Sequence, residues 1–238
     1  MNPIRLLLAT AALLFAAHAA SAAPFEDTMA QRTLACTVCH GLQGRAGPDG
    51  YYPRIAGKPE GYLFNQLLNF RDGRRHYGAM TRLLDPLSDA YLQQIARHFA
   101  SLEVPYPPPT APRVPAELLE RGRRIALEGV PASQVPACAA CHGAALTGVQ
   151  PNTPGLLGLP ADYLQAQLGA WRTGQRRAHA PDCMAQVARA LSPEDLNAAV
   201  TWLASQPAPA QPKAVDRLPQ PPAIACGSAA LPAGRQQP

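Results

Sequence analysis

The chain has 238 residues, of which 47% are hydrophobic and only 6% aromatic, and its formal net charge is +5. This length is enough for one large domain or for two small ones. Basic and acidic residues are interspersed, and no basic stripe with interleaved aromatic residues occurs, which argues against a nucleic-acid-binding protein.

The first 23 residues have the pattern of an export signal. Arg5 precedes an apolar run over residues 6–17, and the small residues SAA at 21–23 fit the A-x-A cleavage rule. The run approaches the length of a membrane-spanning helix, so an uncleaved anchor is the alternative. His18 and the alanine-rich end favour a signal peptide over residues 1–23. We therefore expect the mature chain to be exported and not membrane-spanning.

Four of the six cysteines lie in two C-x-x-C-H pentapeptides, which is the attachment signature of c-type haem. The two thiols add across the haem vinyl groups, and the adjacent imidazole is placed to bind the iron. A redox dithiol would not need a histidine directly after it, and a zinc site would need further Cys or His pairs at short spacing. The sequence therefore predicts two haem c groups (iron), attached through Cys36, Cys39, Cys138 and Cys141 and ligated by His40 and His142.

The chain also repeats itself. Residues 62–73 align with residues 163–174, and residues 87–101 align with residues 191–205. The separation of the aligned segments is close to that of the two haem motifs, which indicates a duplicated domain and not a short solenoid repeat. The second copy has gained a few residues just before its last segment.

Each copy predicts three helices around a loop-rich middle, so the expected fold class is all-α. A serine N-cap precedes apolar residues at helical spacing in the last helix of each copy. A covalently held haem would supply much of the apolar surface that such short domains lack. The expected helices are 27–36, 59–73 and one beginning at Ser88 in the first copy, and 115–130, 160–174 and one beginning at Ser192 in the second.

The repeats also divide the chain. We expect an N-terminal domain over residues 24–101 and a C-terminal domain over residues 117–206. Residues 102–116 contain six prolines and favour a semi-rigid polyproline II tether. Residues 207–238 are rich in proline and alanine without periodicity, and predict an extended tail.

A histidine-ligated haem has a second iron face to fill. Met80 and Met184 stand at matching places, between the middle and the last helix of their copies, in a chain with few methionines. A thioether is a soft donor that favours Fe(II) and raises the reduction potential. Two filled axial positions leave no room for substrate, which points to electron transfer and not to catalysis at the iron. His76 and His179 lie near the methionines and remain alternative ligands.

At this point the chain resembles a known family. The paired CxxCHG motifs, P-x-x-x-G, YL-x-x-QL-x-x-[FW]R-x-G, a following Met and then LS are similar to the dihaem cytochrome c4 family over residues 30–205. The resemblance implies two tandem class I cytochrome c domains that carry electrons in the bacterial periplasm. Redox proteins such as a membrane cytochrome complex, a terminal oxidase or a dehydrogenase would be its partners.

The resemblance also carries site residues over to this chain. It implies His40 with Met80, and His142 with Met184, as the two axial pairs. It supports Pro53 and Pro154 as carbonyl acceptors for the imidazole N–H groups, a role that their spacing from the histidines allows but does not require.

The segment HAPDCM, residues 179–184, departs from that family pattern. Cys183 stands where the first copy has Ala79, so no haem motif accounts for it. Only Cys183 and Cys226 remain once the four haem cysteines are assigned. In an oxidising compartment we expect this pair to form a disulfide that holds the tail beside Met184.

The main hypothesis is therefore a periplasmic electron carrier and not an enzyme. One alternative is a haem enzyme of sulfur or peroxide chemistry, for example a thiosulfate-oxidising dehydrogenase, in which Cys183 ligates the iron as a thiolate. Another is a cytochrome subunit of a dehydrogenase or oxidase complex, with the tail as its docking element.

Overall fold

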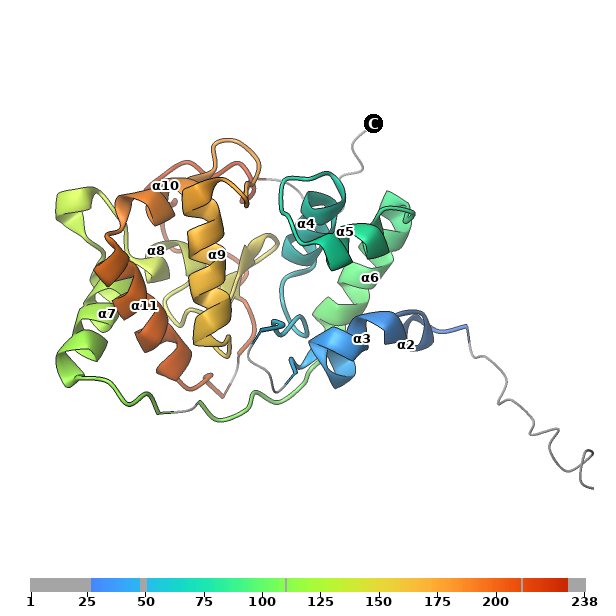
Figure 1. The fold of residues 1–238 in the computed structure, drawn as a ribbon, viewed down its shortest axis with the longest axis horizontal. Helices are drawn as coiled ribbons and strands as arrows, with labels where there is room; N and C mark the ends of the chain where they lie inside the picture. The colour runs from blue at the N-terminus through green and yellow to red at the C-terminus, as the bar shows by residue number, and fades with distance from the viewer. Residues whose placement is uncertain (1–26, 48–50, 110, 211, 231–238) are drawn as a thin grey trace, which may run out of the picture. The chain divides into compact units, whose positions relative to one another are not determined.

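The computed structural model of the chain describes residues 27–47, 51–109, 111–210 and 212–230 (Figure 1). The expected signal peptide over residues 1–23 lies outside these residues. The chain divides into two units, residues 1–32 and 33–238. In the first unit, helix α2 (Met29–Arg32) carries an ion pair of 2.5 Å between Arg32 and Asp27. No helix of the described residues is both long and apolar enough to cross a bilayer.

The second unit is mostly helical, as expected. The first copy contributes α3 (Leu34–His40), the 3-10 turn η1 (Leu42–Gly44), α4 (Glu60–Arg71), α5 (Gly78–Leu84) and α6 (Asp89–Ser101). The second copy contributes α7 (Ala116–Glu128), η2 (Pro131–Ser133), α8 (Cys138–His142), α9 (Ala161–Thr173), α10 (Cys183–Ala190) and α11 (Pro193–Ser205). Two short strands, β1 (Gly148–Val149) and β2 (Thr153–Pro154), form an antiparallel pair.

The three-helix prediction omitted several short helices: the expected helix over residues 27–36 is instead α2 and α3, the second haem motif forms α8, and one further helix precedes the last helix of each copy. Helices α5 and α10 contain Met80 and Met184, in segments too short to show a helical period in the sequence. Helix α10 begins where the Asp182 carboxylate accepts the backbone N–H of Ala185 at 3.0 Å, an N-cap that could have been found in the sequence.

Serine caps start the last helix of both copies, as the sequence predicts. The Ser88 hydroxyl accepts the N–H of Tyr91 at 3.3 Å, and the Ser192 hydroxyl accepts the N–H of Asp195 at 3.0 Å. The apolar residues that follow face inward: Leu92, Ile95 and Phe99 are buried in α6, and Leu196, Val200 and Leu203 are buried in α11.

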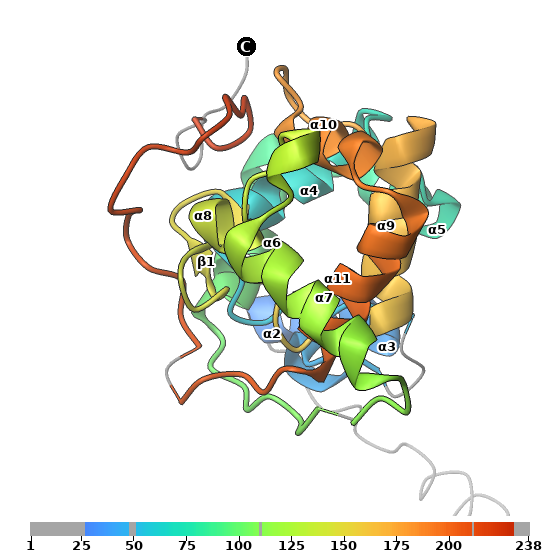
Figure 2. The same ribbon diagram turned by 90° about the vertical axis from the view of Figure 1, so that its left-hand side faces the viewer.

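The core of the second copy lies where α7 crosses α11, with α9 beside them (Figure 2). Gly122 makes this crossing close, because a Cβ at that position would lie 2.1 Å from the carbonyl oxygen of Ala198. A glycine in the middle of a helix is unfavourable by itself. At this position the close packing of α7 against α11 offsets that cost.

Glycines also end the two short haem-motif helices. Gly41 follows His40 with φ +72° and ψ 166°, and Gly143 follows His142 with φ +82° and ψ 148°. This backbone region is open to glycine almost alone. A Cβ at Gly41 would lie 2.2 Å from the carbonyl oxygen of Ala46. The chain can therefore turn sharply away from each histidine only because glycine follows it.

The two copies meet at equivalent positions of the repeated sequence. Arg75 and Arg176 face each other in an antiparallel backbone bridge, and the N–H of Arg177 donates to the carbonyl oxygen of Arg74 at 2.6 Å. Such a contact, in which the same surface of two related units pairs with itself, is what a two-fold relationship produces.

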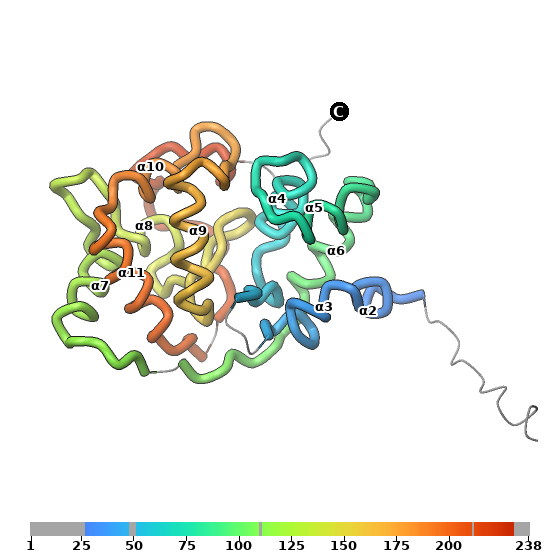
Figure 3. Tube along the Cα trace, viewed as in Figure 1, coloured from blue at the N-terminus to red at the C-terminus, as the bar shows by residue number. Residues whose placement is uncertain are grey.

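The described residues of the tail, 207–210 and 212–230, contain no helix (Figure 3), and the tail runs as an extended segment past β1 (Figure 2). The N–H of Val215 donates to the carbonyl oxygen of Gly148 at 3.0 Å, and its carbonyl accepts the N–H of Gln150 at 2.8 Å. Further along, the expected disulfide joins Cys183 to Cys226. The tail is therefore fixed to the second copy at both places.

The disulfide closes a loop of 43 residues, which is worth about 4 kcal/mol on the chain-entropy model. We predict that Cys226→Ser lowers the free energy of unfolding by roughly that amount, measured by urea denaturation of the haem-loaded protein. Cys183→Ser should cost the same, because either substitution removes the same bond. Free alkylation of Cys183 in the native, non-reduced protein would contradict the prediction.

Gly41→Ala should destabilise the protein more than Gly73→Ala does. Both glycines have a positive φ, +72° and +74°, so an alanine costs about 1–2 kcal/mol at either position. Gly73 has no atom within 4 Å of a built Cβ and serves as the matched control. We expect Gly41→Ala to lower the free energy of unfolding at least twice as much as Gly73→Ala does. Equal losses would show that the turn after His40 relaxes around a methyl group.

Candidate haem sites

A buried histidine ends each C-x-x-C-H helix and is held by a proline carbonyl. The Nδ1 atom of His40 lies 2.8 Å from the carbonyl oxygen of Pro53, and that of His142 lies 2.7 Å from the carbonyl oxygen of Pro154. A carbonyl can only accept, so Nδ1 carries the proton in both rings. The Nε2 lone pair of each ring is left for a metal ion.

Both imidazoles are kept neutral by their surroundings. Burial lowers the pKa of His40 and of His142, and the hydrogen bond to the proline carbonyl acts in the opposite direction. A nearby positive charge lowers each pKa further: Arg75 acts on His40, and Lys58 acts on His142. A metal ligand must be deprotonated, so neutral rings are ready to bind iron at neutral pH.

The four thiols of the haem motifs do not resemble a redox dithiol or a zinc site. None of Cys36, Cys39, Cys138 and Cys141 forms a disulfide in the structure. Burial raises the pKa of the Cys138 thiol to about 11 and raises those of Cys36 and Cys141. Reactive dithiols need the reverse shift. The described part of the chain also contains no group of three or more His, Cys, Asp or Glu side chains that could hold a metal.

The structure places the two methionines on corresponding helices. Met80 is half-buried in α5, which packs against α4. Met184 is half-buried in α10 and packs in a small cluster with Trp171, Ala185 and Ala188. Each methionine lies in the first turn of its helix, with its copy's haem-motif histidine on a different helix.

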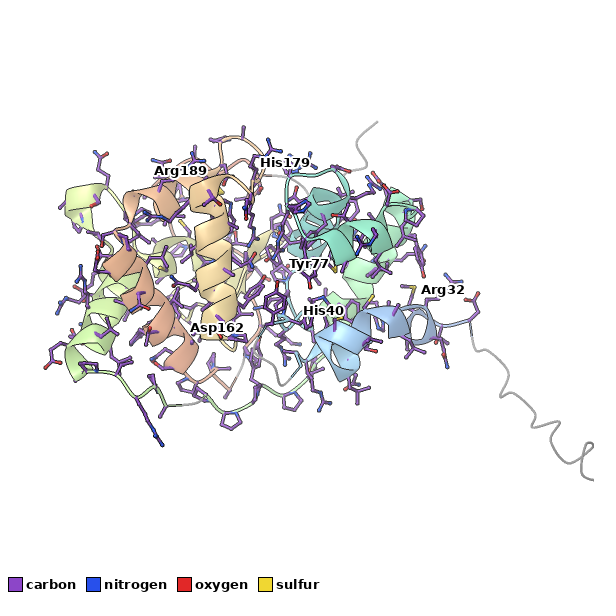
Figure 4. The ribbon with its side chains drawn as sticks, in the orientation of Figure 1. Arg32, His40, Tyr77, Asp162, His179 and Arg189 are labelled. Carbon is purple, nitrogen blue, oxygen red and sulfur yellow. A yellow bond between two sulfur atoms is a disulfide. The ribbon has the colours of Figure 1, made fainter. Side chains whose placement is uncertain are left out.

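The alternative ligands lie in the loops just before the two methionine helices. His76 is exposed, whereas His179 lies on the loop between α9 and α10 (Figure 4). The backbone N–H of His179 donates to the hydroxyl of Ser228 in the tail at 3.2 Å. Cys183 is held in the disulfide, so it has no thiolate to offer iron, and the enzyme hypothesis built on that thiolate is not supported.

Sequence reasoning missed a cluster of buried arginines between the two copies. Arg75 and Arg176 are buried, and each donates to both Gln66 and Gln167 over distances of 2.7–3.0 Å. Arg75 also donates to the hydroxyl of Tyr163 at 3.0 Å. The Gln, Arg and Tyr residues of this cluster recur at the same aligned positions in both copies. The sequence alignment of the repeats therefore contained a signal for the cluster.

These guanidinium groups have no acidic partner among the described residues. Arg75 lies over the ring of Phe70 at 4.4 Å, and Arg176 lies over the ring of Trp171 at 3.8 Å. Two buried positive charges without an anion are unfavourable, and neutral amides compensate them only in part. An anionic group bound nearby would relieve this cost.

The residues present fit haem c. This group needs a thiol pair, a neutral imidazole with a free Nε2 and a source of positive charge for its two carboxylates. The chain offers free thiols, histidines oriented by Pro53 and Pro154, and buried arginines without acidic partners. The fit rests on the chemistry of the donor atoms and on the uncompensated charge.

Known proteins share this arrangement. The family model for cytochrome c matches residues 119–207. A thiosulfate dehydrogenase electron acceptor of Thiomonas intermedia is 38% identical, with 86% of this chain and 93% of that protein covered. A cytochrome c4 of Pseudomonas aeruginosa is 33% identical over 83% of this chain and 94% of its own length.

A solved structure agrees with these relatives. Reduced cytochrome c4 from Pseudomonas stutzeri superposes with a TM-score of 0.64 at 30% identity, covering 74% of this chain and 96% of that one. The likeness therefore extends over both copies, beyond the single region that the family model matches. The chain belongs to the dihaem cytochrome c4 family, and it is a c-type cytochrome that carries electrons and not an enzyme.

Proposed function

We propose that this cytochrome holds one haem c in each copy and accepts single electrons from a thiosulfate dehydrogenase. The observation that carries the two-haem proposal is the repeated geometry of His40 and His142. Each ends a C-x-x-C-H helix, is buried, and donates its Nδ1–H to a proline carbonyl at nearly the same distance. Each copy therefore holds a histidine that is oriented to bind a haem iron.

The residue roles follow the repeat. Cys36 and Cys39 attach the first haem and Cys138 and Cys141 the second. The axial pairs are His40 with Met80 and His142 with Met184, and Pro53 and Pro154 orient the histidines. A bound haem supplies a one-electron Fe(III)/Fe(II) couple, and thioether ligation raises its potential.

We also propose the domain boundaries that the sequence repeat predicts. The first haem domain is residues 24–101, the second is residues 117–206, and residues 102–116 join them. The beginning of the linker is held against the first domain, because Arg54 donates to the carbonyl oxygens of Val104 and Pro105 and stacks on Tyr106 at 3.9 Å. The tail is residues 207–238, and Val215 and Cys226 attach it to the second domain.

A redox protein is the partner class. The name of the Thiomonas intermedia relative supports a thiosulfate dehydrogenase as the electron donor. Exposed apolar side chains at the first haem motif suit a brief encounter of this kind, because Leu34, Val38 and Leu42 are 54%, 84% and 67% exposed. Weak electron-transfer complexes use small interfaces. The export signal over residues 1–23 supports a periplasmic location.

Replacing each axial methionine by histidine tests the ligand assignment. We predict that Met80→His and Met184→His each abolish one of two Met–Fe(III) charge-transfer bands and lower one potential by on the order of 0.1–0.3 V. Near-infrared absorption and a spectroelectrochemical titration measure these effects. Met29→Leu is the control and should keep both bands. A single band in the unmodified protein, unchanged in Met184→His, would instead show that another side chain such as His179 binds the second iron.

The partner is tested by reduction of the haem-loaded protein. We predict that a thiosulfate dehydrogenase with thiosulfate reduces it within seconds, seen as the sharp visible bands of ferrous haem c. Thiosulfate alone should leave it oxidised. Rapid reduction by thiosulfate without the dehydrogenase would indicate that this protein is itself an enzyme. No reduction in the presence of both thiosulfate and the dehydrogenase would show that the dehydrogenase is not its electron donor.

A further inference from the structure

One lysine crosses from the first copy into the second. Lys58 lies just before α4, and its Nζ donates to the carbonyl oxygen of Gly155 at 2.7 Å. Its side chain is buried, with only 4% of the residue exposed. The tip of a first-copy residue therefore lies inside the second copy, beside the loop that carries Pro154.

This contact places a charge next to the proposed second haem ligand. Gly155 directly follows Pro154, whose carbonyl oxygen accepts the Nδ1–H of His142 at 2.7 Å. The contact of Lys58 therefore lies one peptide unit from the carbonyl oxygen that holds His142.

The lysine has no acidic partner among the described residues, and its charged neighbour Arg54 has the same sign. Burial, together with Arg54, lowers the pKa of Lys58 to about 7. An ammonium group buried without an anion is costly to the fold.

Packing does not require a lysine at this place. The equivalent residue of the second copy is Leu159, which precedes Pro160 as Lys58 precedes Pro59, and it is buried as an ordinary apolar side chain. The two copies therefore use the same backbone position in two ways. The charge is present only where it reaches the other copy's histidine.

We propose that Lys58 of the first copy raises the reduction potential of the haem held by His142. The inference rests on the proposed haem of the second copy. Reduction adds one electron to the iron site, so the protonated ammonium group of Lys58 stabilises the ferrous form over the ferric form, most fully at a pH below its pKa of about 7. In a buried position this interaction is weakly screened by water and salt. The first copy thereby favours residence of the electron on the second copy.

The test compares substitutions that separate charge from hydrogen bonding. Lys58→Gln keeps an N–H donor without the charge, Lys58→Met removes both, and Lys58→Arg keeps the charge. We expect Lys58→Gln and Lys58→Met to shift the electron-transfer equilibrium between the haems about tenfold toward the first, or ~59 mV for one electron. Lys58→Arg should stay within about threefold of the unmodified protein.

The measurement is a spectroelectrochemical titration of the haem-loaded protein, with the second haem identified through the Met184→His variant. Lys213→Gln is the matched control. It removes the same formal charge from the chain's other lysine, whose side chain is 75% exposed and paired with Glu103. This control should change neither potential measurably, because water screens an exposed charge.

Each other outcome overturns the inference. No shift, or an equal shift of both haems, would show that Lys58 does not act on the second haem specifically. A shift in Lys58→Met but not in Lys58→Gln would assign the effect to the hydrogen bond. Loss of the second haem in both uncharged variants, seen by intact mass, would give Lys58 a role in assembly. A single haem in the unmodified protein would instead refute the proposed function.

Discussion

The hydrogen bond from a buried imidazole to a proline carbonyl, formed once in each copy, sets the chemistry of both candidate sites. It fixes the tautomer, so the nitrogen that faces away from the carbonyl keeps its lone pair. It needs His40 and His142 at the ends of short helices and a chain that turns back at once, which is why glycine follows both histidines. The segments carrying these prolines are anchored differently: Gly57 after Pro53 donates to the carbonyl oxygen of Phe99 in α6, whereas Pro154 lies in β2 and pairs with β1.

Duplication explains where the two copies touch. Because both carry the same Gln and Arg positions, the surface of one can pair with the same surface of the other, and Arg75 and Arg176 each reach both Gln66 and Gln167. This arrangement buries two positive charges without an acidic side chain. An anionic group bound nearby would lower the cost of this burial.

The copies differ where their functions can diverge. Lys58 and Leu159 occupy one repeated position, and only the lysine brings a charge to the other copy's histidine. The disulfide and the tail likewise brace the second copy alone, with Cys183 next to Met184. These differences place the two similar haem sites in unlike surroundings. Unlike surroundings are what would give the two haems of one chain different reduction potentials.

The sequence by itself determined the helical class, the duplication, the cysteine attachment pattern and the remaining cysteine pair. These follow from local spacing: C-x-x-C-H, serine caps and a repeated register are visible along the chain. The short helices α5 and α10 were missed, since about two turns give no measurable period. Their presence depends on packing against α4 and α9.

Only the tertiary structure decided which distant groups meet. Lys58 and Gly155, or Arg75 and Tyr163, are far apart along the chain, and nothing in their local sequence marks them as partners. The aligned repeats show that Gln and Arg recur, but not that the recurring faces pair with each other. Burial and pairing of charges depend on how two folded copies pack, and local sequence carries no direct record of that packing.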